Sequence, residues 1–104
     1  MDEVKDNAAQ SRYELVRDGV LAIETYVRTP GVVDIQHALV PKEAEGRGMA
    51  TALTRGALDL IRARGEKVIP TCPFVYVYMR KHPETQDLLA DPQYFDKHPP
   101  EHRH

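Results

Sequence analysis

A change of hydrophobic period at Met49 constrains the fold of this chain more than any other sequence feature. From Met49 onward, apolar side chains recur at helical spacing for about four turns, whereas the segments before it have the residue content of β-strands. A glycine-containing loop, residues 43–48, joins the two patterns. We therefore expect one amphipathic helix lying on a sheet. The apolar stripe of this helix consists of Met49, Leu53, Ala57 and Leu60, with Ala50 and Ile61 beside it.

The expected strands before the helix are rich in Val, Ile, Tyr and Thr and are bounded by turn residues. They cover residues 12–17, 20–29 and 32–40. Asp18-Gly19 tolerates the backbone of a tight hairpin, so the first two strands should pair antiparallel. A second turn at residues 29–31 makes a three-stranded meander.

Alternation along the third strand assigns its residues to two faces. One face is expected to carry Val33, Ile35, His37 and Leu39, so that a histidine interrupts an apolar surface. Gly65 is expected to stop the helix, and residues 66–70 form a fourth strand. Residues 74–81 are compatible with a strand or with a short helix.

The length of 104 residues leaves room for one domain only. Its composition, 41% hydrophobic and 29% charged, is that of a globular protein. We predict a flexible N-terminal segment at residues 1–10, a folded domain at 11–90 and a polar tail rich in proline and histidine at 91–104.

Charge and apolar content exclude several function classes. A formal net charge of −2 gives no overall positive field for nucleic acid, and no apolar run is long enough to cross a membrane. We therefore expect a cytoplasmic protein that binds neither. The single cysteine, Cys72, forms no internal disulfide or zinc knuckle, and the histidines of the tail lie in a flexible context, so no metal site is predicted.

The segment 45–50, with the sequence EGRGMA, is the strongest candidate for a binding site. Two glycines let the backbone approach an anion, and the free N–H groups of the first helical turn favour phosphate. The loop lacks the Lys-Ser/Thr pair of a P-loop and the third glycine of the dinucleotide fingerprint, so ATP and NAD are not expected. An ordinary strand-to-helix turn is the alternative interpretation.

Several motifs in order resemble one known family. Residues 41–53, PKEAEGRGMATAL, resemble the acetyl-CoA-binding signature Gln/Arg-x-x-Gly-x-Gly/Ala of the GNAT superfamily of N-acetyltransferases, with Glu45 standing where Gln or Arg is usual. Residues 13–89 as a whole are similar to a small GNAT-like family. The other motifs that carry this similarity are His37, Pro70-Thr71-Cys72-Pro73-Phe74-Val75 and His82-Pro83-Glu84.

The resemblance implies a truncated GNAT-like α+β fold, with a mixed, mostly antiparallel sheet and packed helices. It further implies that acetyl-CoA is the cosubstrate, with its pantetheine arm along the third strand and its pyrophosphate on the glycine loop. The implied cofactor-binding residues are Ala38, Leu39, Val40, Glu45, Gly46, Arg47, Gly48, Met49 and Ala50. A basic cluster at residues 80–82 is a candidate for the adenosine 3′-phosphate.

The resemblance also implies catalytic roles for two residues. His37 would take the proton of an amine, and Cys72 would protonate the departing CoA thiolate or carry the acetyl group itself. A histidine within a core and an unreactive buried cysteine are the alternatives. We expect an N-acetyltransferase acting on a small-molecule or protein amine. The alternatives are a CoA-binding module without efficient transfer and an interaction domain that retains the fold and uses Tyr76, Tyr78 and the tails. Exposed sheet edges favour a homodimer.

Overall fold

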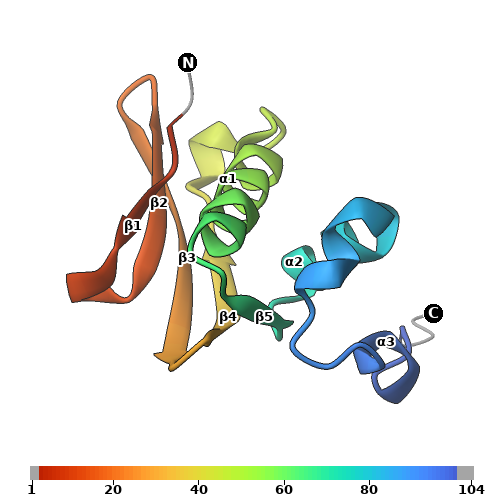
Figure 1. Cartoon of the computed structure of the whole chain (residues 1–104). Helices are drawn as coiled ribbons and strands as arrows, with labels where there is room; N and C mark the ends of the chain where they lie inside the picture. Colours follow the sequence, from red (N-terminus) through yellow and green to blue (C-terminus); the bar gives the residue numbers. More distant parts are fainter. Residues whose placement is uncertain (1–2, 101–104) are drawn as a thin grey trace.

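The computed structural model describes residues 3–100 of the chain. Within these residues one five-stranded sheet follows the order of the chain (Figure 1). Neighbouring strands are antiparallel except the last two, which are parallel. This mixed, mostly antiparallel sheet with packed helices is the α+β fold expected from the sequence. The strands are β1 (Lys5–Asn7), β2 (Arg12–Arg17), β3 (Val20–Thr29), β4 (Val32–Leu39) and β5 (Lys67–Pro70).

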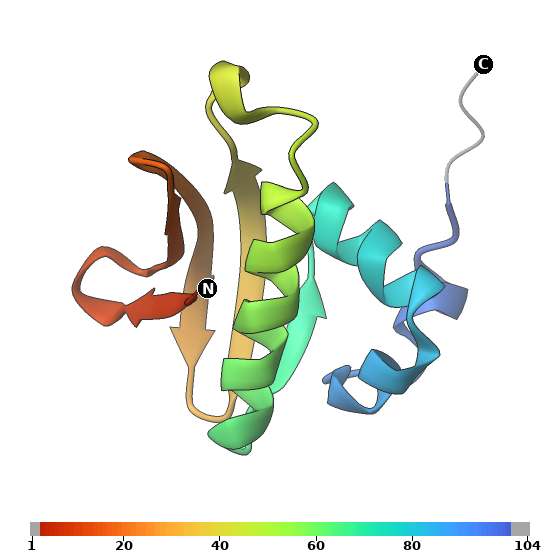
Figure 2. The ribbon, with the colours of Figure 1, turned by 90° about the horizontal axis from the view of Figure 1, so that it is seen from above.

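Helix α1 (Met49–Ala63) connects β4 to β5 and lies across one face of the sheet (Figure 2). Helix α2 (Pro73–Lys81) follows β5 and packs beside α1, and a short helix, α3 (Tyr94–Lys97), comes last. Residues 74–81 are therefore helical. Pro73 at the first position favours this outcome, because its fixed φ suits a helix start and its missing N–H has no helical partner. Within residues 3–100, 3₁₀ helices cover Ala8–Gln10, Lys42–Ala44 and Pro83–Leu88.

The hydrophobic core lies between α1 and the covered face of the sheet. The expected stripe of α1 faces this core, and Gly65, with a φ of 69°, ends the helix as predicted. β2, β3 and β4 contribute alternating residues. Fully buried core residues include Tyr13, Leu15, Ala22, Val33, Ile35, Leu53, Ala57, Ile61 and Val68.

A β-bulge in β4 changes which residues share a face. Tyr26 pairs with Ile35, but the preceding residue, Thr25, pairs with His37, so Gln36 is an extra residue on β4. A bulge of this kind reverses the alternation of all residues beyond it. Val33 and Ile35 therefore share the core face as predicted. The prediction is wrong for His37 and Leu39, which lie on the opposite, exposed face of the sheet.

Residues 3–10 are more structured than the flexible segment that the sequence suggests. β1 pairs with β2 and becomes the edge of the sheet. Asp6, on β1, accepts a hydrogen bond of 2.8 Å from the Arg28 guanidinium and one of 2.6 Å from the Tyr26 hydroxyl. These partners come from β3, and a short polar segment gives no local sign of contacts with residues so distant in the chain.

Residues 91–100 are also more structured than the predicted tail. The rings of Tyr94 and Phe95 pack edge-on against Tyr76 of α2, with centroids 6.3 and 5.3 Å away. The His98 ring stacks on Tyr94 at 4.1 Å. The aromatic residues of this segment therefore hold it against α2. Residues 101–104 lie outside the described part of the chain.

Candidate functional site

The glycine loop leads into α1 with a backbone that only glycine adopts readily. Gly46 and Gly48 have φ values of 83° and 75°, and Gly48 is the N-cap of α1. No side chain caps the helix, and no acidic residue stands in its first turn. A Cβ atom on either glycine would project into open space, where nothing lies within 4 Å. The N-terminus of α1 thus presents its N–H groups to an accessible anion site.

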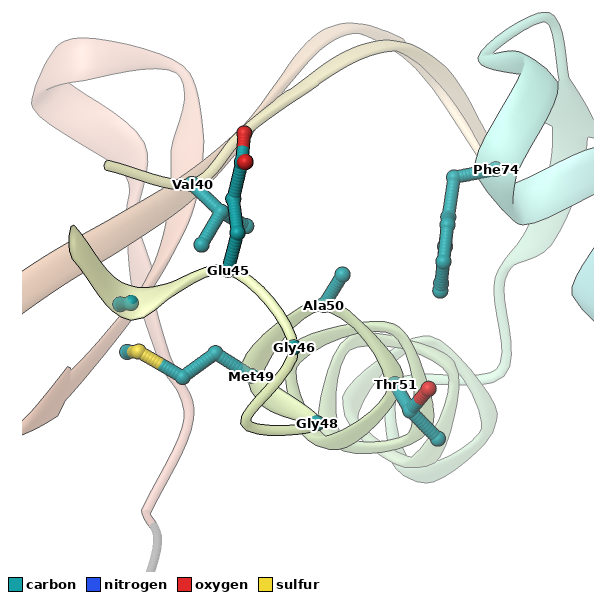
Figure 3. A pocket seen from close by; sticks show the side chains of 9 residues that line it. Val40, Glu45, Gly46, Gly48, Met49, Ala50, Thr51 and Phe74 are labelled. Carbon is teal, nitrogen blue, oxygen red and sulfur yellow. The ribbon is translucent and has the colours of Figure 1, made fainter. Parts of the chain in front are cut away.

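A cavity of about 250 Å³ adjoins this helix start. It extends from Val40, just after β4, past Ala50 to the ring of Phe74 on α2 (Figure 3). In Figure 3 the carboxylate of Glu45 points away from Gly48 and Thr51, toward the opposite end of the lining residues. The lining residues are Val40, Ala44, Glu45, Gly46, Gly48, Met49, Ala50, Thr51 and Phe74. The cavity therefore brings together six of the nine residues that the sequence implied for cofactor binding.

Two arginines lie at the glycine loop. Arg47 is exposed within it, and the guanidinium of Arg17, at the end of β2, donates a hydrogen bond of 2.8 Å to the Arg47 carbonyl. Arg17 was missed by sequence reasoning, because only the hairpin of β2 and β3 brings it to a loop thirty positions away. Both cations favour the approach of a phosphate.

A second hollow, of about 210 Å³, shares Thr51 and Phe74 with the first. It reaches Lys81 and His82 at the end of α2. Arg80, the third member of the predicted basic cluster, lies instead over the rings of Tyr76 and Phe95. Two of the three residues therefore line a continuation of the glycine-loop cavity.

β4 continues beyond its parallel neighbour. The last pair between β4 and β5 joins Ile35 to Pro70, and the Cys72 N–H then donates a hydrogen bond of 2.8 Å to the Ile35 carbonyl. The chain turns away into α2 at this point. Among the described residues, the rest of β4, including Ala38 and Leu39, keeps only β3 as a strand partner. The two parallel strands thus separate at this point, and the edge of β4 beyond Ile35 has no neighbouring strand among the described residues.

Cys72 is 2% exposed and is the N-cap residue of α2. Burial raises the pKa of its thiol above the ordinary value, although the backbone N–H groups of Val75, Phe74 and Ala38 act in the opposite direction by favouring the thiolate. The charge of Glu24 also raises this pKa. The sulfur is thus a neutral thiol in a small ring of N–H groups.

His37 lies on the opposite face of the sheet from Cys72. Its backbone pairs with Thr25, whose neighbours on β3 point into the core, and its side chain is exposed because of the bulge at Gln36. The structure therefore does not bring the two predicted catalytic side chains onto one face. No helix among residues 3–100 covers the face of the sheet on which His37 lies (Figure 2). The exposed apolar side chains of this face are those of Val16, Leu21, Val27 and Leu39.

Glu24 is a buried carboxyl group that sequence reasoning missed. It is 0% exposed on the core face of β3, and burial raises its pKa to about 7. The Thr54 hydroxyl donates a hydrogen bond of 2.5 Å to Oε2, while Oε1 has no hydrogen-bond partner within the described residues. The signal was present: between Ala22 and Tyr26, Glu24 interrupts an otherwise apolar alternation.

Two negative findings concern residues 3–100 only. They contain no cluster of three or more His, Cys, Asp or Glu side chains arranged to hold a metal ion. None of their helices is long and apolar enough to span a membrane.

A family model described as GCN5-related N-acetyl-transferase matches residues 12–88. The chain belongs to this family. The NATD1 proteins of Gallus gallus and Mus musculus are each 37% identical to it over 57 residues, which cover 55% of this chain and 52% of the relative. NATD1 of Homo sapiens is also 37% identical over 57 residues, or 50% of its length. The match thus spans about half of each relative.

Proposed function

We propose that this protein binds acetyl-CoA and transfers the acetyl group to an amine. The observation that carries this proposal is the cavity at the start of α1, where no side chain caps the helix. The cavity includes Val40, which follows the part of β4 that no longer pairs with β5. In this arrangement the pyrophosphate lies on the N–H groups that follow Gly48. The helix dipole and the nearby Arg17 and Arg47 favour its charge.

The rest of the cofactor follows from the position of the pyrophosphate. The pantetheine arm runs from the cavity along residues 38–40, where the separation of β4 and β5 leaves an edge available for hydrogen bonds. The adenosine end occupies the hollow beside Lys81 and His82, where the Lys81 ammonium supplies charge for a 3′-phosphate. The thioester then lies near Cys72, which follows the last β4–β5 pair.

The exposed position of His37 fits a role toward the acceptor. With acetyl-CoA along the β4 edge, an amine can approach the thioester from the open face of the sheet, on which His37 stands. The imidazole of His37 takes the proton that the amine releases, acting as the general base. Cys72 acts from the buried side on the CoA sulfur. The two residues thus serve the two ends of the reaction from opposite faces.

The test is the release of free CoA thiol from acetyl-CoA in the presence of a panel of small amines and lysine peptides. We expect turnover with at least one acceptor class, and a loss of about a hundredfold to ten-thousandfold in kcat for His37→Ala, as for other general bases. Gln36→Ala, beside His37 on the same strand, is the matched control. Binding of acetyl-CoA without turnover for any acceptor would favour the CoA-binding module instead.

The interaction-domain alternative depends on Tyr76, Tyr78 and the tails, and one of the two rings is buried. Tyr78 is 7% exposed, and Tyr76 packs against Tyr94 and Phe95 of the same chain. The Tyr78 ring is therefore buried, whereas the Tyr76 ring is half-buried and lines a hollow with Tyr94 and His98. The enzyme is the function that the glycine-loop cavity supports best.

A further inference from the structure

A larger cavity, of about 480 Å³, lies at the end of β5 and shares no lining residue with the glycine-loop cavity. Its size is usual for a small-molecule site. We call it the tyrosine cavity, because its walls include the rings of Tyr76, Tyr94 and His98. Four prolines and Val77 make the rest of the lining mostly apolar, and Thr71 supplies a hydroxyl group. The cavity thus suits a ligand with an apolar body.

Contacts within the chain hold the rings of the tyrosine cavity in place. The Tyr76 hydroxyl donates a hydrogen bond to the His98 carbonyl, and the His98 ring stacks on Tyr94 with centroids 4.1 Å apart. A wall that is fixed before a ligand arrives costs little ordering entropy on binding. Aromatic faces also attract cations. The Arg80 guanidinium, 5.8 Å from the centroid of the Tyr76 ring, shows this attraction outside the cavity.

A carboxylate without a cationic partner stands behind the hydroxyl group of this cavity. Asp34 is half-buried, and its Oδ1 accepts a hydrogen bond of 2.5 Å from the Thr71 hydroxyl. Its Oδ2 has only a long contact of 3.5 Å with the Gln36 amide. No cationic side chain among residues 3–100 forms an ion pair with Asp34, and Lys97 of α3 pairs instead with Asp91 at 2.9 Å. The charge and the available oxygen of Asp34 therefore suit an ammonium group.

We propose that the tyrosine cavity binds a small organic ammonium ion, with its apolar body against the rings and its ammonium group directed to Asp34. The proposal rests on the proposed function in one respect, namely that this ligand is the acceptor amine. Asp34 lies on the same uncovered face of the sheet as His37, since two buried core residues flank it on β4. Thr71 directly precedes Cys72, near which the thioester is expected. The acceptor class is therefore an amine with an aromatic or alkyl body.

The test is an NMR titration with 2-phenylethylamine at about pH 8, where the amine carries its charge. 2-Phenylethanol has a similar body without the charge and is the neutral probe. Binding is followed on the ring protons of Tyr76, Tyr94 and His98. The ring of Tyr13, which is buried in the core and does not line the cavity, is the internal reference.

Two variants separate the charge of Asp34 from its shape. Asp34→Asn removes the charge and keeps the size of the side chain. Asp59→Asn changes the net charge equally at an exposed position of α1 outside the tyrosine cavity, and is the matched control.

We expect 2-phenylethylamine to shift the signals of the three lining rings and to leave those of Tyr13 unchanged. Asp34→Asn should weaken this binding at least about tenfold, or about 1.4 kcal/mol, and leave the binding of 2-phenylethanol unchanged. Asp59→Asn should change neither. Absence of shifts at the lining rings of the wild type would overturn the proposal. An equal loss for the amine and the alcohol in Asp34→Asn would also overturn it, because it would show disturbed packing and no effect of charge.

This titration is made without acetyl-CoA, so its outcome does not depend on the cosubstrate. With acetyl-CoA present, Asp34→Asn should raise the KM for 2-phenylethylamine about tenfold or more and leave the KM for acetyl-CoA unchanged. Turnover of other amines without turnover of 2-phenylethylamine would overturn the acceptor assignment and leave the proposed function standing. Binding of 2-phenylethylamine without turnover of any amine would contradict the proposed function and confirm the cavity as an ammonium site.

Discussion

Val4 lies directly against Gly56 in the middle of α1. A Cβ atom on this glycine would stand 2.3 Å from Val4 Cγ2 and 2.5 Å from Val4 Cβ. The glycine thus permits the close approach of the N-terminal segment to the helix, and β1 reaches its place at the sheet edge through this contact.

Gly56→Ala should therefore destabilise the protein. Alanine gains about 1 kcal/mol over glycine in a helix, but overpacking at a close contact costs about 1–3 kcal/mol. We expect a net loss of about 1 kcal/mol, measured as the free energy of unfolding in urea. In a Val4→Gly background the clash is absent, so the same substitution should become neutral or stabilising. Stabilisation in the wild-type background would contradict the account.

The Arg28 cluster predicts a second stability effect. The Arg28 guanidinium bridges Asp6 of β1, at 2.8 Å, and Glu66 after α1, at 3.0 Å. Asp6→Asn removes one partner from a largely buried cation and should cost about 1–3 kcal/mol of unfolding free energy. Asp87→Asn, which breaks an exposed pair with Arg62, is the control and should have a much smaller effect. Equal losses of unfolding free energy in the two variants would show that the burial of the Arg28 cluster does not strengthen its ion pairs.

The buried Glu24 predicts a pH dependence of stability. The unfolded chain protonates this residue near its ordinary pKa of 4.5 and the folded chain near 7, so the folded state binds the proton more tightly. Its contribution to stability is therefore full below the lower value and is lost as pH rises to the upper one, by roughly 3 kcal/mol. Glu24→Gln should remove this loss. Urea unfolding at about pH 5 and about pH 8 compares the two proteins, and identical pH dependence would refute the assignment.

Direct transfer of the acetyl group predicts the absence of an adduct on Cys72. Intact-protein mass spectrometry after brief exposure to acetyl-CoA should show equal acetylation in the wild type and in Cys72→Ser, since the thiol is neutral and buried. An extra acetyl group in the wild type that Cys72→Ser lacks would instead support a covalent intermediate.

Local patterns in the sequence correctly predicted β2 to β5 and helix α1, whereas β1 was missed and residues 74–81 were left open between strand and helix. The stripe from Met49 to Ile61, the hairpin at Asp18-Gly19 and the stop at Gly65 each depend on neighbouring residues, which is why they could be predicted. The glycine loop was recognisable for the same reason. The cavity beside it also contains Phe74, which the sequence did not assign to the site, because α2 reaches the loop only through tertiary packing.

The errors arose where distant residues decide the structure. The bulge at Gln36 leaves no mark in the alternation of β4 itself, so the side of the sheet on which His37 stands could not be predicted. The N-terminal segment that contains β1 is held in place by contacts with Arg28 and Gly56, which are far along the chain. Glu24 was visible as a charge within an apolar pattern, but its hydrogen-bond partner Thr54 follows it by 30 positions.

The central claim is that the start of α1 binds acetyl-CoA, and isothermal titration of Gly48→Ala against Gly31→Ala tests it most directly. Both glycines have positive φ and open space around them, so both substitutions introduce similar backbone strain. Of these two glycines, Gly48 lines the cavity and Gly31 does not. We predict that acetyl-CoA binds the wild type and Gly31→Ala equally and binds Gly48→Ala at least about tenfold more weakly, about 1.4 kcal/mol. Equal binding to all three proteins, or none to the wild type, would contradict the account.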